Sequence, residues 1–256
     1  MKAFSVPTLI YILIFSFIGS VVSLTGGIFL LLREKTALKF SHLIASFAAG
    51  ALLATAFFDL LPEASEVAGD SVDIFLWTLI GILSFFLLER FVHWFHHHHE
   101  HEDAGSKPTI PLIMVGDTVH NFIDGIAMGA AFLVSVPLGI VTALAVATHE
   151  IPQEVGDFGL MLHRGVTRKK IILFNIFSAL AAMAGALLIY FVGDIVEGLL
   201  PIFLAVTAGF FIYIAASDII PEIHSENRRG FAFYESLLLI TGVVVVWVTI
   251  ILLEPH

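Results

Sequence analysis

The sequence of 256 residues contains no cysteine and few charged residues. Without cysteine the chain can form neither disulfide bonds nor thiolate metal sites, such as copper(I) sites built on cysteine. Only 13% of the residues are charged, whereas about 25% are charged in an average soluble domain. The net charge is −10, and the chain has only 12 lysines and arginines. This balance argues against binding to nucleic acid, which needs clustered basic residues.

Apolar residues make up 58% of the chain, and the mean hydropathy is +0.98. Because a soluble core of this size cannot bury so many apolar residues, we expect an all-α membrane protein with a single domain over residues 1–256. A helix needs about 20 apolar residues to cross a bilayer. By this criterion we expect eight transmembrane helices at Val6–Leu32, His42–Leu61, Ile74–Phe95, Ile110–Val134, Pro137–Leu162, Ile171–Phe191, Leu199–Ile220 and Phe233–Leu253.

The basic residues indicate which side of the membrane each connection faces. Eight spans place both termini on one side and the odd-numbered connections on the other. All lysines and arginines except Lys2 lie in or next to those odd connections: Arg33, Lys35, Lys39, Arg90, Lys107, Arg164, Arg168, Lys169, Lys170, Arg228 and Arg229. Since cytoplasmic loops are enriched in basic residues, we expect a multi-pass cell membrane protein with both termini extracytoplasmic.

One sequence pattern, G-x8-D-x2-P-E, occurs twice at an offset of 159 residues. Its two copies are Gly50, Asp59, Pro62 and Glu63, and Gly209, Asp218, Pro221 and Glu222. The second and seventh spans, which carry them, would cross the membrane in opposite directions. The pattern therefore predicts an inverted repeat of spans 1–3 and 6–8 around spans 4–5, an arrangement common in transporters. The alternative is a chance coincidence between two apolar helices.

The fourth and fifth spans contain the potential metal ligands. The fourth carries Asp117, His120, Asn121 and Asp124, and the fifth carries His149, Glu150, Gln153, Glu154 and Asp157. One such residue would be satisfied by a hydrogen bond between helices. These two spans contain several carboxylates, and residues 110–163 contain no lysine or arginine to neutralise them. Unpaired carboxylates inside a membrane favour a bound cation. Pro152 also frees the backbone carbonyl of Thr148 or kinks the helix.

Imidazole, carboxylate and amide ligands together suit Zn²⁺, Fe²⁺, Co²⁺, Ni²⁺ or Cd²⁺, and Mn²⁺ less well. The residues therefore predict a divalent metal transporter with no organic cofactor, and this mixture of ligands does not choose among these metals. A His-rich cytoplasmic loop at about 93–108 is expected to act as a metal buffer or as a solvated linker. Its histidines are His93, His96, His97, His98, His99 and His101.

The motifs HNFIDG at 120–125 and HEIPQEVGD at 149–157 resemble those of the ZIP family of metal transporters. The resemblance implies that the chain is no enzyme, that it moves zinc into the cytoplasm through a two-metal centre, and that it forms homodimers. It assigns one metal to His120, Asp124, His149 and Gln153, and the second to Asn121, Glu150 and Asn175. Glu154 and Asp157 are further candidate metal ligands because of their positions in the fifth span. The expected transport path adds Asp59, Glu63, Asp117, Asp218, Glu222 and His224.

The chain departs from the motif at Gln153, where the corresponding ZIP branch often has a second histidine. Two other functions are compatible with part of the pattern. A metal exporter would use the same ligands, since ligand chemistry does not set direction. An intramembrane zinc metalloprotease would need H-E-x-x-H, but Gln153 replaces the second histidine and Pro152 distorts that turn.

Overall fold

The computed structural model describes residues 6–32, 34–68, 72–94, 110–163, 165–224 and 231–253, and these ranges are almost entirely helical. Eight long helical segments follow one another along them. Their elements are α1 (Val6–Leu32), α2 (Glu34–Thr55), the π-helical turn η1 (Ala56–Leu60), α3 (Leu61–Ala68), α4 (Ile74–Trp94), α5 (Ile110–Val134), α6 (Val136–His163), α7 (Arg168–Val196), the 3₁₀ turn η3 (Glu197–Leu199), α8 (Leu200–Tyr213), the π-helical turn η4 (Ile214–Ile219), α9 (Ile220–His224) and α10 (Phe231–Leu253).

Six segments within the described ranges are long and apolar enough to cross a membrane: Pro7–Phe29, Leu43–Ala68, Ile74–Phe91, Arg168–Gly193, Leu200–Ile219 and Ala232–Leu253. The remaining long helices, α5 and α6, have 25 and 28 residues and contain the polar motifs. An all-helical, multi-pass membrane protein is therefore confirmed.

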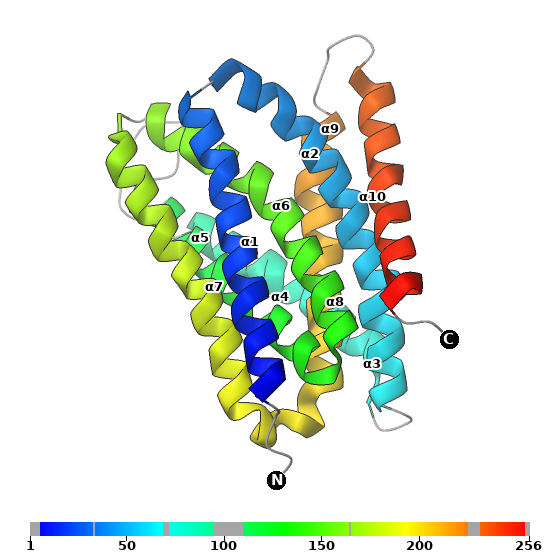
Figure 1. Ribbon diagram of the computed structural model, residues 1–256. Coiled ribbons are helices and arrows are strands. Elements are labelled where there is room, and N and C mark those ends of the chain that lie inside the picture. The colour runs from blue at the N-terminus through cyan, green and yellow to red at the C-terminus, as the bar shows by residue number, and fades with distance from the viewer. Residues whose placement is uncertain are drawn as a thin grey trace.

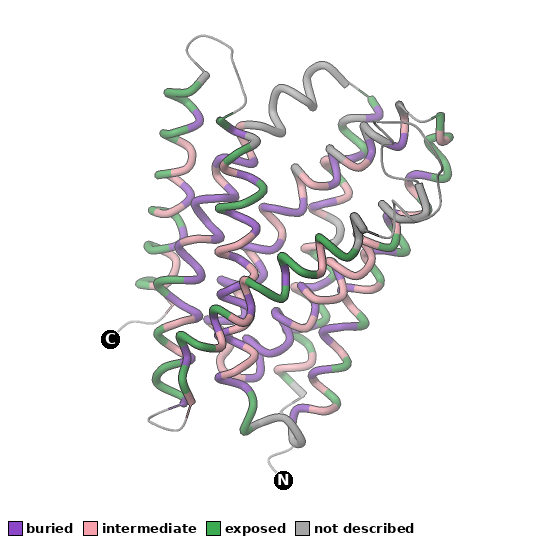
Figure 2. Tube along the Cα trace, turned by 180° about the vertical axis from the view of Figure 1, so that it is seen from behind, coloured by how far each residue is buried: buried purple, intermediate pink, exposed green. Residues whose placement is uncertain are grey.

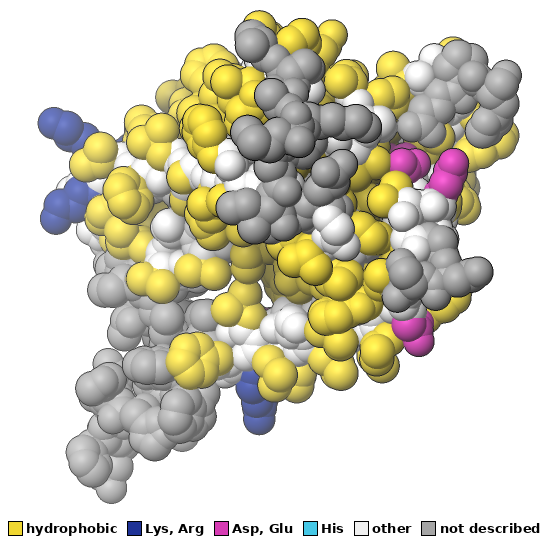
Figure 3. All heavy atoms as spheres, turned by 90° about the horizontal axis from the view of Figure 1, so that it is seen from below, with side chains coloured by type: hydrophobic (Ala, Val, Ile, Leu, Met, Phe, Trp, Pro, Cys, Tyr) yellow, Lys and Arg dark blue, Asp and Glu magenta, His cyan; other side chains and the backbone are white. Residues whose placement is uncertain are grey.

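The helices lie side by side in one elongated bundle (Figure 1). Its main contacts pair α5 with α7, α1 with α6, α2 with α10 and α4 with α8. Figure 2 shows buried residues along the inward faces and exposed residues along the outer helices. Figure 3 views the bundle from one end and shows apolar side chains over much of that face. Many large apolar side chains of the long helices are exposed, as expected for a surface in contact with lipid.

The two π-helical turns occupy equivalent places in the two copies of the repeated pattern. In η1 the N–H of Leu61 donates to the carbonyl of Ala56, and in η4 the N–H of Ile220 donates to that of Ala215. Each turn ends two residues before the pattern's proline. A proline lacks the N–H donor and crowds the carbonyl four residues earlier, and a wider turn relieves that crowding.

The expected span boundaries agree with the helices to within a few residues, except in the second span. This span begins at Glu34 and continues through η1 to Ala68, because polar residues at its ends extend the helix beyond the apolar stretch. The helix α6 runs unbroken from Val136 to His163, so Pro152 does not interrupt it.

Glycines bring pairs of helices into close contact. A Cβ added to Gly50 of α2 would collide with the backbone carbonyl of Leu239 in α10, and one added to Gly209 of α8 would collide with that of Thr78 in α4. In contrast, a Cβ added to Gly19 of α1 would have no atom within 4 Å. Small residues that allow backbones to approach are typical of membrane helix interfaces.

We therefore expect Gly50→Ala and Gly209→Ala to lower the thermal stability of the protein in detergent by several degrees, because each added methyl group must push two backbones apart. The matched control is Gly19→Ala, which should be neutral or slightly stabilising since alanine favours helix by about 1 kcal/mol. Thermal unfolding of the purified variants measures this. Equal midpoints for Gly50→Ala and Gly19→Ala would contradict the packing described.

Candidate metal centre

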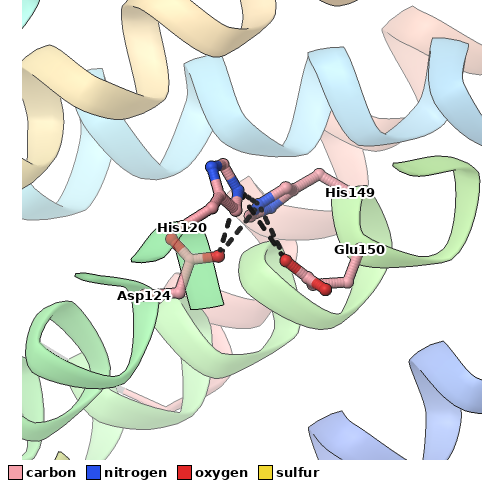
Figure 4. A group of neighbouring side chains, drawn as sticks. All are labelled: His120, Asp124, His149 and Glu150. Carbon is pink, nitrogen blue, oxygen red and sulfur yellow. Dashed lines mark hydrogen bonds and ion pairs between the residues drawn. The ribbon is translucent and has the colours of Figure 1, made fainter. Parts of the chain in front are cut away.

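Two histidines and two carboxylates meet between α5 and α6. α5 contributes His120 and Asp124, which are four residues apart and share one helix face, and α6 contributes His149 and Glu150. Figure 4 shows the four side chains directed toward one another. One ligand atom from each lies within 4.8 Å of all the others. We call this set the histidine group.

The distances within the histidine group are close to those between ligands that share one metal ion. Nε2 of His149 lies 3.1 Å from Oδ2 of Asp124, and Nε2 of His120 lies 3.5 Å from the same oxygen. The two Nε2 atoms are 3.2 Å apart. Oε1 of Glu150 lies 3.7 and 3.9 Å from them. Since zinc ligands sit about 2 Å from the ion, they lie roughly 3–4 Å from one another, so a small inward shift would complete a site.

The surrounding residues fix the orientation of both imidazole rings. Nδ1 of His149 lies 3.1 Å from the carbonyl oxygen of Ala145, one turn earlier. Because a carbonyl can only accept, this nitrogen must carry the proton, which leaves Nε2 of His149 able to bind a metal. Phe85 of α4 packs edge-on against the ring of His120, with centroids 5.5 Å apart. Phe211 of α8 packs similarly against His149 at 6.2 Å.

The histidine group is removed from solvent. Asp124 and Glu150 are each 3% exposed, and His149 is 2% exposed. Neither α5 nor α6 contains a lysine or arginine, so these helices supply no permanently charged cation to balance the two carboxylates. Buried carboxylates without such a partner are stabilised by a bound cation.

A second group of potential ligands lies beside the first and shares one residue with it. Carboxylate oxygens of Asp117, Glu150 and Glu154 lie within 4.8 Å of one another. Nδ2 of Asn121 donates to Oδ1 of Asp117 at 3.1 Å, which places Asn121 at the edge of this group. The resemblance assigned a second metal to Asn121, Glu150 and Asn175, and that ligand set stays a prediction.

A small cavity extends from the second group to α7. It is lined by Met114, Asp117, Glu154, Asp157, Met161, Phe174 and Asn175. Asn175 and Asp157 therefore lie close to Asp117 and Glu154, as part of one enclosed space. Gln153 is half-buried and follows His149 by one helical turn, and its role as a ligand stays a prediction.

The remaining candidates of the transport path lie at the repeated pattern. Asp59 is buried in η1 and Glu63 is half-buried in α3, whereas Asp218 in η4 and His224 in α9 are exposed. None of them belongs to either ligand group among the residues that the structure describes. The side chains of Glu222 and His93, and the loop histidines His96–His99 and His101, lie outside the described residues.

Three contacts at the centre were not predicted from the sequence. Phe85, Phe211 and the carbonyl of Ala145 all orient the histidine rings. Phe85 and Phe211 lie in apolar helices that contain several phenylalanines. Which phenylalanine contacts a histidine depends on how each helix is rotated in the bundle, and the sequence does not show this. The bond to Ala145 fits the ordinary four-residue spacing of a helix, and this spacing could have suggested it.

The profile of the ZIP Zinc transporter family matches residues 6–111 and 104–249, nearly the whole chain. A similar protein is Zinc transporter ZIP13 of Pongo abelii, which is 31% identical over 254 residues covering 90% of this chain and 76% of that protein. The chain belongs to the ZIP family. Membership places it among transporters rather than enzymes, which disfavours the metalloprotease.

Other ZIP relatives share a shorter part of the chain. Zinc transporter ZIP4 of Mus musculus is 43% identical over 146 residues, covering 57% of this chain and 22% of that protein. Zinc transporter ZIP6 of Homo sapiens is 37% identical over 150 residues, covering 56% of this chain and 20% of that protein. The chain thus spans only about a fifth of the length of these two relatives.

If the histidine group binds metal, Asp124→Asn should weaken zinc binding by the purified protein by on the order of 10- to 100-fold, since loss even of an outer metal partner has effects of this size. Asp73→Asn is the matched control, because Asp73 is exposed and its Oδ1 accepts from the N–H of Leu76, which asparagine can also do. Isothermal titration with Zn²⁺ measures both. Equal affinities would exclude Asp124 as a ligand.

Proposed function

We propose that this ZIP family member carries Zn²⁺ across the membrane, and that the ion passes through the histidine group between α5 and α6. The observation that carries the proposal is the convergence of His120, Asp124, His149 and Glu150 in a buried space between two helices that lack lysine and arginine. A divalent cation is the ligand that this charge and this donor set require. The three similar proteins described above are each named a zinc transporter, which agrees with zinc as the substrate.

We further propose that all eight long helical segments span the membrane, with α5 and α6 as the fourth and fifth. The polar residues of α5 and α6 lie inside the bundle, so a lipid-facing apolar surface is supplied mainly by the six more hydrophobic segments. The distribution of basic residues then places both termini outside the cytoplasm.

An inverted repeat explains several contacts in the bundle. Figure 1 shows α2 and α8 running in opposite directions. The glycine contacts of α2 with α10 repeat those of α8 with α4: Gly50 faces Leu239 and Val243, and Gly209 faces Thr78 and Ile82. Gly50 and Gly209 differ by 159 residues, and the partners in α4 and α10 differ by 161. The pairing of π-helical turns η1 and η4 follows the same relation.

The proposed repeat also relates α5 to α6, because each of them contacts an equivalent glycine of the pair α1 and α7. Gly26 of α1 faces Ile151 and Val155 of α6, and Gly185 of α7 faces Phe122 and Ile126 of α5. The two glycines again differ by 159 residues, while their partners differ by 29. His120 and His149 also differ by 29. The two histidines would therefore lie on either side of the repeat axis, where secondary transporters commonly bind substrate.

The direction of transport, into the cytoplasm, is proposed from the family resemblance. Homodimer formation, the transport of Fe²⁺, Mn²⁺, Cd²⁺, Co²⁺ or Ni²⁺, and a metal-buffering role for the His-rich loop likewise stay predictions.

In reconstituted vesicles, His120→Ala and Glu150→Ala should reduce zinc uptake to near the level of empty vesicles, because each removes a ligand that the ion must meet. Asp73→Asn should transport at the parental rate. Zinc flux is followed with a trapped fluorescent indicator, and Fe²⁺, Mn²⁺ and Cd²⁺ are supplied separately. Parental uptake by both alanine variants would refute the proposed path.

The topology can be tested directly because the chain has no cysteine of its own. In whole cells, Ser5→Cys should react with a membrane-impermeant maleimide, since the amino terminus is proposed to face outward. Ser106→Cys, between α4 and α5, should react only after permeabilisation. The opposite pattern would reverse the orientation, and equal accessibility of both positions would contradict the eight-span count.

A further inference from the structure

The two histidines of the metal centre are held in place by different contacts. The ring of His149 is fixed by a hydrogen bond between its Nδ1 and the carbonyl oxygen of Ala145. Among the residues that the structure describes, His120 makes its polar contacts through Nε2, the atom that faces the other ligands. A metal-binding imidazole needs a second contact, by hydrogen bond or by packing, to fix its ring. For His120 that contact is the edge-on packing of Phe85.

Phe85 is itself held by aromatic side chains of α8. It is 7% exposed, and the centroid of its ring lies 5.3 Å from that of Phe210 and 5.5 Å from that of Tyr213. Tilted aromatic pairs at such distances attract each other beyond the effect of their buried surface. Phe210 and Tyr213 are three residues apart and share one face of α8. The position of Phe85 beside His120 therefore depends on how α8 packs against α4.

A hydrogen bond connects α4 and α8 at these aromatic rings. The hydroxyl of Tyr213 donates to Oε2 of Glu89 at 2.5 Å. Glu89 follows Phe85 by four residues, so both lie on the same face of α4. Ser217 and Asp218 of η4 also lie near the phenol. The bond between Glu89 and Tyr213 thus fixes the rotation and the separation of the two helices next to Phe85.

The other half of the proposed repeat has only aliphatic residues at the equivalent positions. At the offsets of 161 and 159 residues seen in the glycine contacts, the counterparts of Phe85, Glu89, Phe210 and Tyr213 are Val246, Ile250, Ala51 and Ala54. These four residues also pack together, in a cluster with Val141 of α6. Helix pairs of this kind therefore pack without aromatic rings or a polar pair. The special composition of the α4–α8 contact favours a role at the metal centre, which only this contact reaches through Phe85.

We propose that Phe85 is a positioning residue for His120, and that the hydrogen bond between Glu89 and Tyr213 holds Phe85 in place from outside the ligand-bearing helices. Glu89 belongs to neither ligand group among the described residues, so it acts through the packing of the rings. When α8 loosens from α4, the ring of His120 turns more freely and the histidine group binds the ion less tightly. The consequence for transport rests on the function proposed above, whereas the effect on binding requires only that the histidine group holds zinc.

Tyr213→Phe removes the hydroxyl and keeps the ring, so it tests the hydrogen bond alone. It should weaken Zn²⁺ binding to the purified full chain several-fold, up to about tenfold, which is the range set by the loss of one net hydrogen bond. Glu89→Leu should have the same effect. Glu89→Gln should stay near the parental affinity, because its amide oxygen still accepts from the phenol. The matched control is Tyr234→Phe, since Tyr234 is exposed on α10. Isothermal titration measures all five proteins.

The route through Phe85 is tested by combining variants. Phe85→Leu should weaken zinc binding by itself, and adding Tyr213→Phe to it should have no further effect, because the bond then has no ring to hold. Independent effects would add instead. Co²⁺ bound in place of Zn²⁺ gives a spectroscopic measure, since its visible absorption changes with the arrangement of its ligands. Phe85→Leu and Tyr213→Phe should alter that spectrum in the same way, whereas a loss of stability alone would lower the unfolding temperature and leave the spectrum unchanged.

Parental zinc affinity and a parental cobalt spectrum in Tyr213→Phe would overturn the proposal, as would additive effects of Tyr213→Phe and Phe85→Leu. Equal losses in Glu89→Gln and Glu89→Leu would also overturn it, because the charge of Glu89 would then matter rather than its hydrogen bond. Zinc uptake by vesicles separates this inference from the proposed function. If the parent binds zinc without transporting it and the variants follow the expected pattern, the transport function fails and the positioning role stands. If the parent transports zinc and the variants bind it equally well, only the positioning role fails.

Discussion

Carboxyl groups buried without a lysine or arginine partner are the constraint on which the rest of the structure depends. Asp124, Glu150 and Glu154 are almost fully buried in helices without lysine or arginine. A charged group deep in a membrane costs several kcal/mol unless it is paired, hydrated or bound to metal. The fold accordingly keeps these side chains inside the bundle and brings the carboxylates and histidines of α5 and α6 close together.

Close helix packing meets this requirement on both sides. On one side, α7 approaches α5 where the backbone at Gly125 meets Ala182 and the backbone at Gly185 meets Phe122. On the other, α1 approaches α6 where Gly26 meets Ile151. A Cβ at Gly125 or Gly185 would collide with the backbone of the facing helix, so these two glycines allow α7 to pack closely against α5.

The sequence was sufficient to predict the helical class, most helix ends and the two ligand-bearing helices, because these depend on local hydropathy and on helical spacing. His120 and Asp124 could be paired in advance since four residues separate them. The grouping of Asp117 with Glu154, and the contact of Phe85 with His120, could not be predicted. Both contacts depend on how neighbouring helices are rotated about their own axes. The sequence of an apolar helix with phenylalanine on several faces does not determine that rotation. The π-helical turns were not predicted either, because a proline in the sequence does not specify how the backbone before it adjusts.

The arrangement at Glu150 also explains in physical terms why a protease-like motif belongs to a transporter. A zinc protease of the H-E-x-x-H type holds its metal with two histidines of one helix, which leaves the glutamate between them free to act on water. Here the position four residues after His149 is Gln153, and the second imidazole comes from His120 on α5. Glu150 then faces the proposed ion site and also lies close to Asp117 and Glu154. A carboxylate placed between two groups of metal ligands is suited to transferring an ion between them, whereas a general base needs a water molecule beside a metal that stays in place.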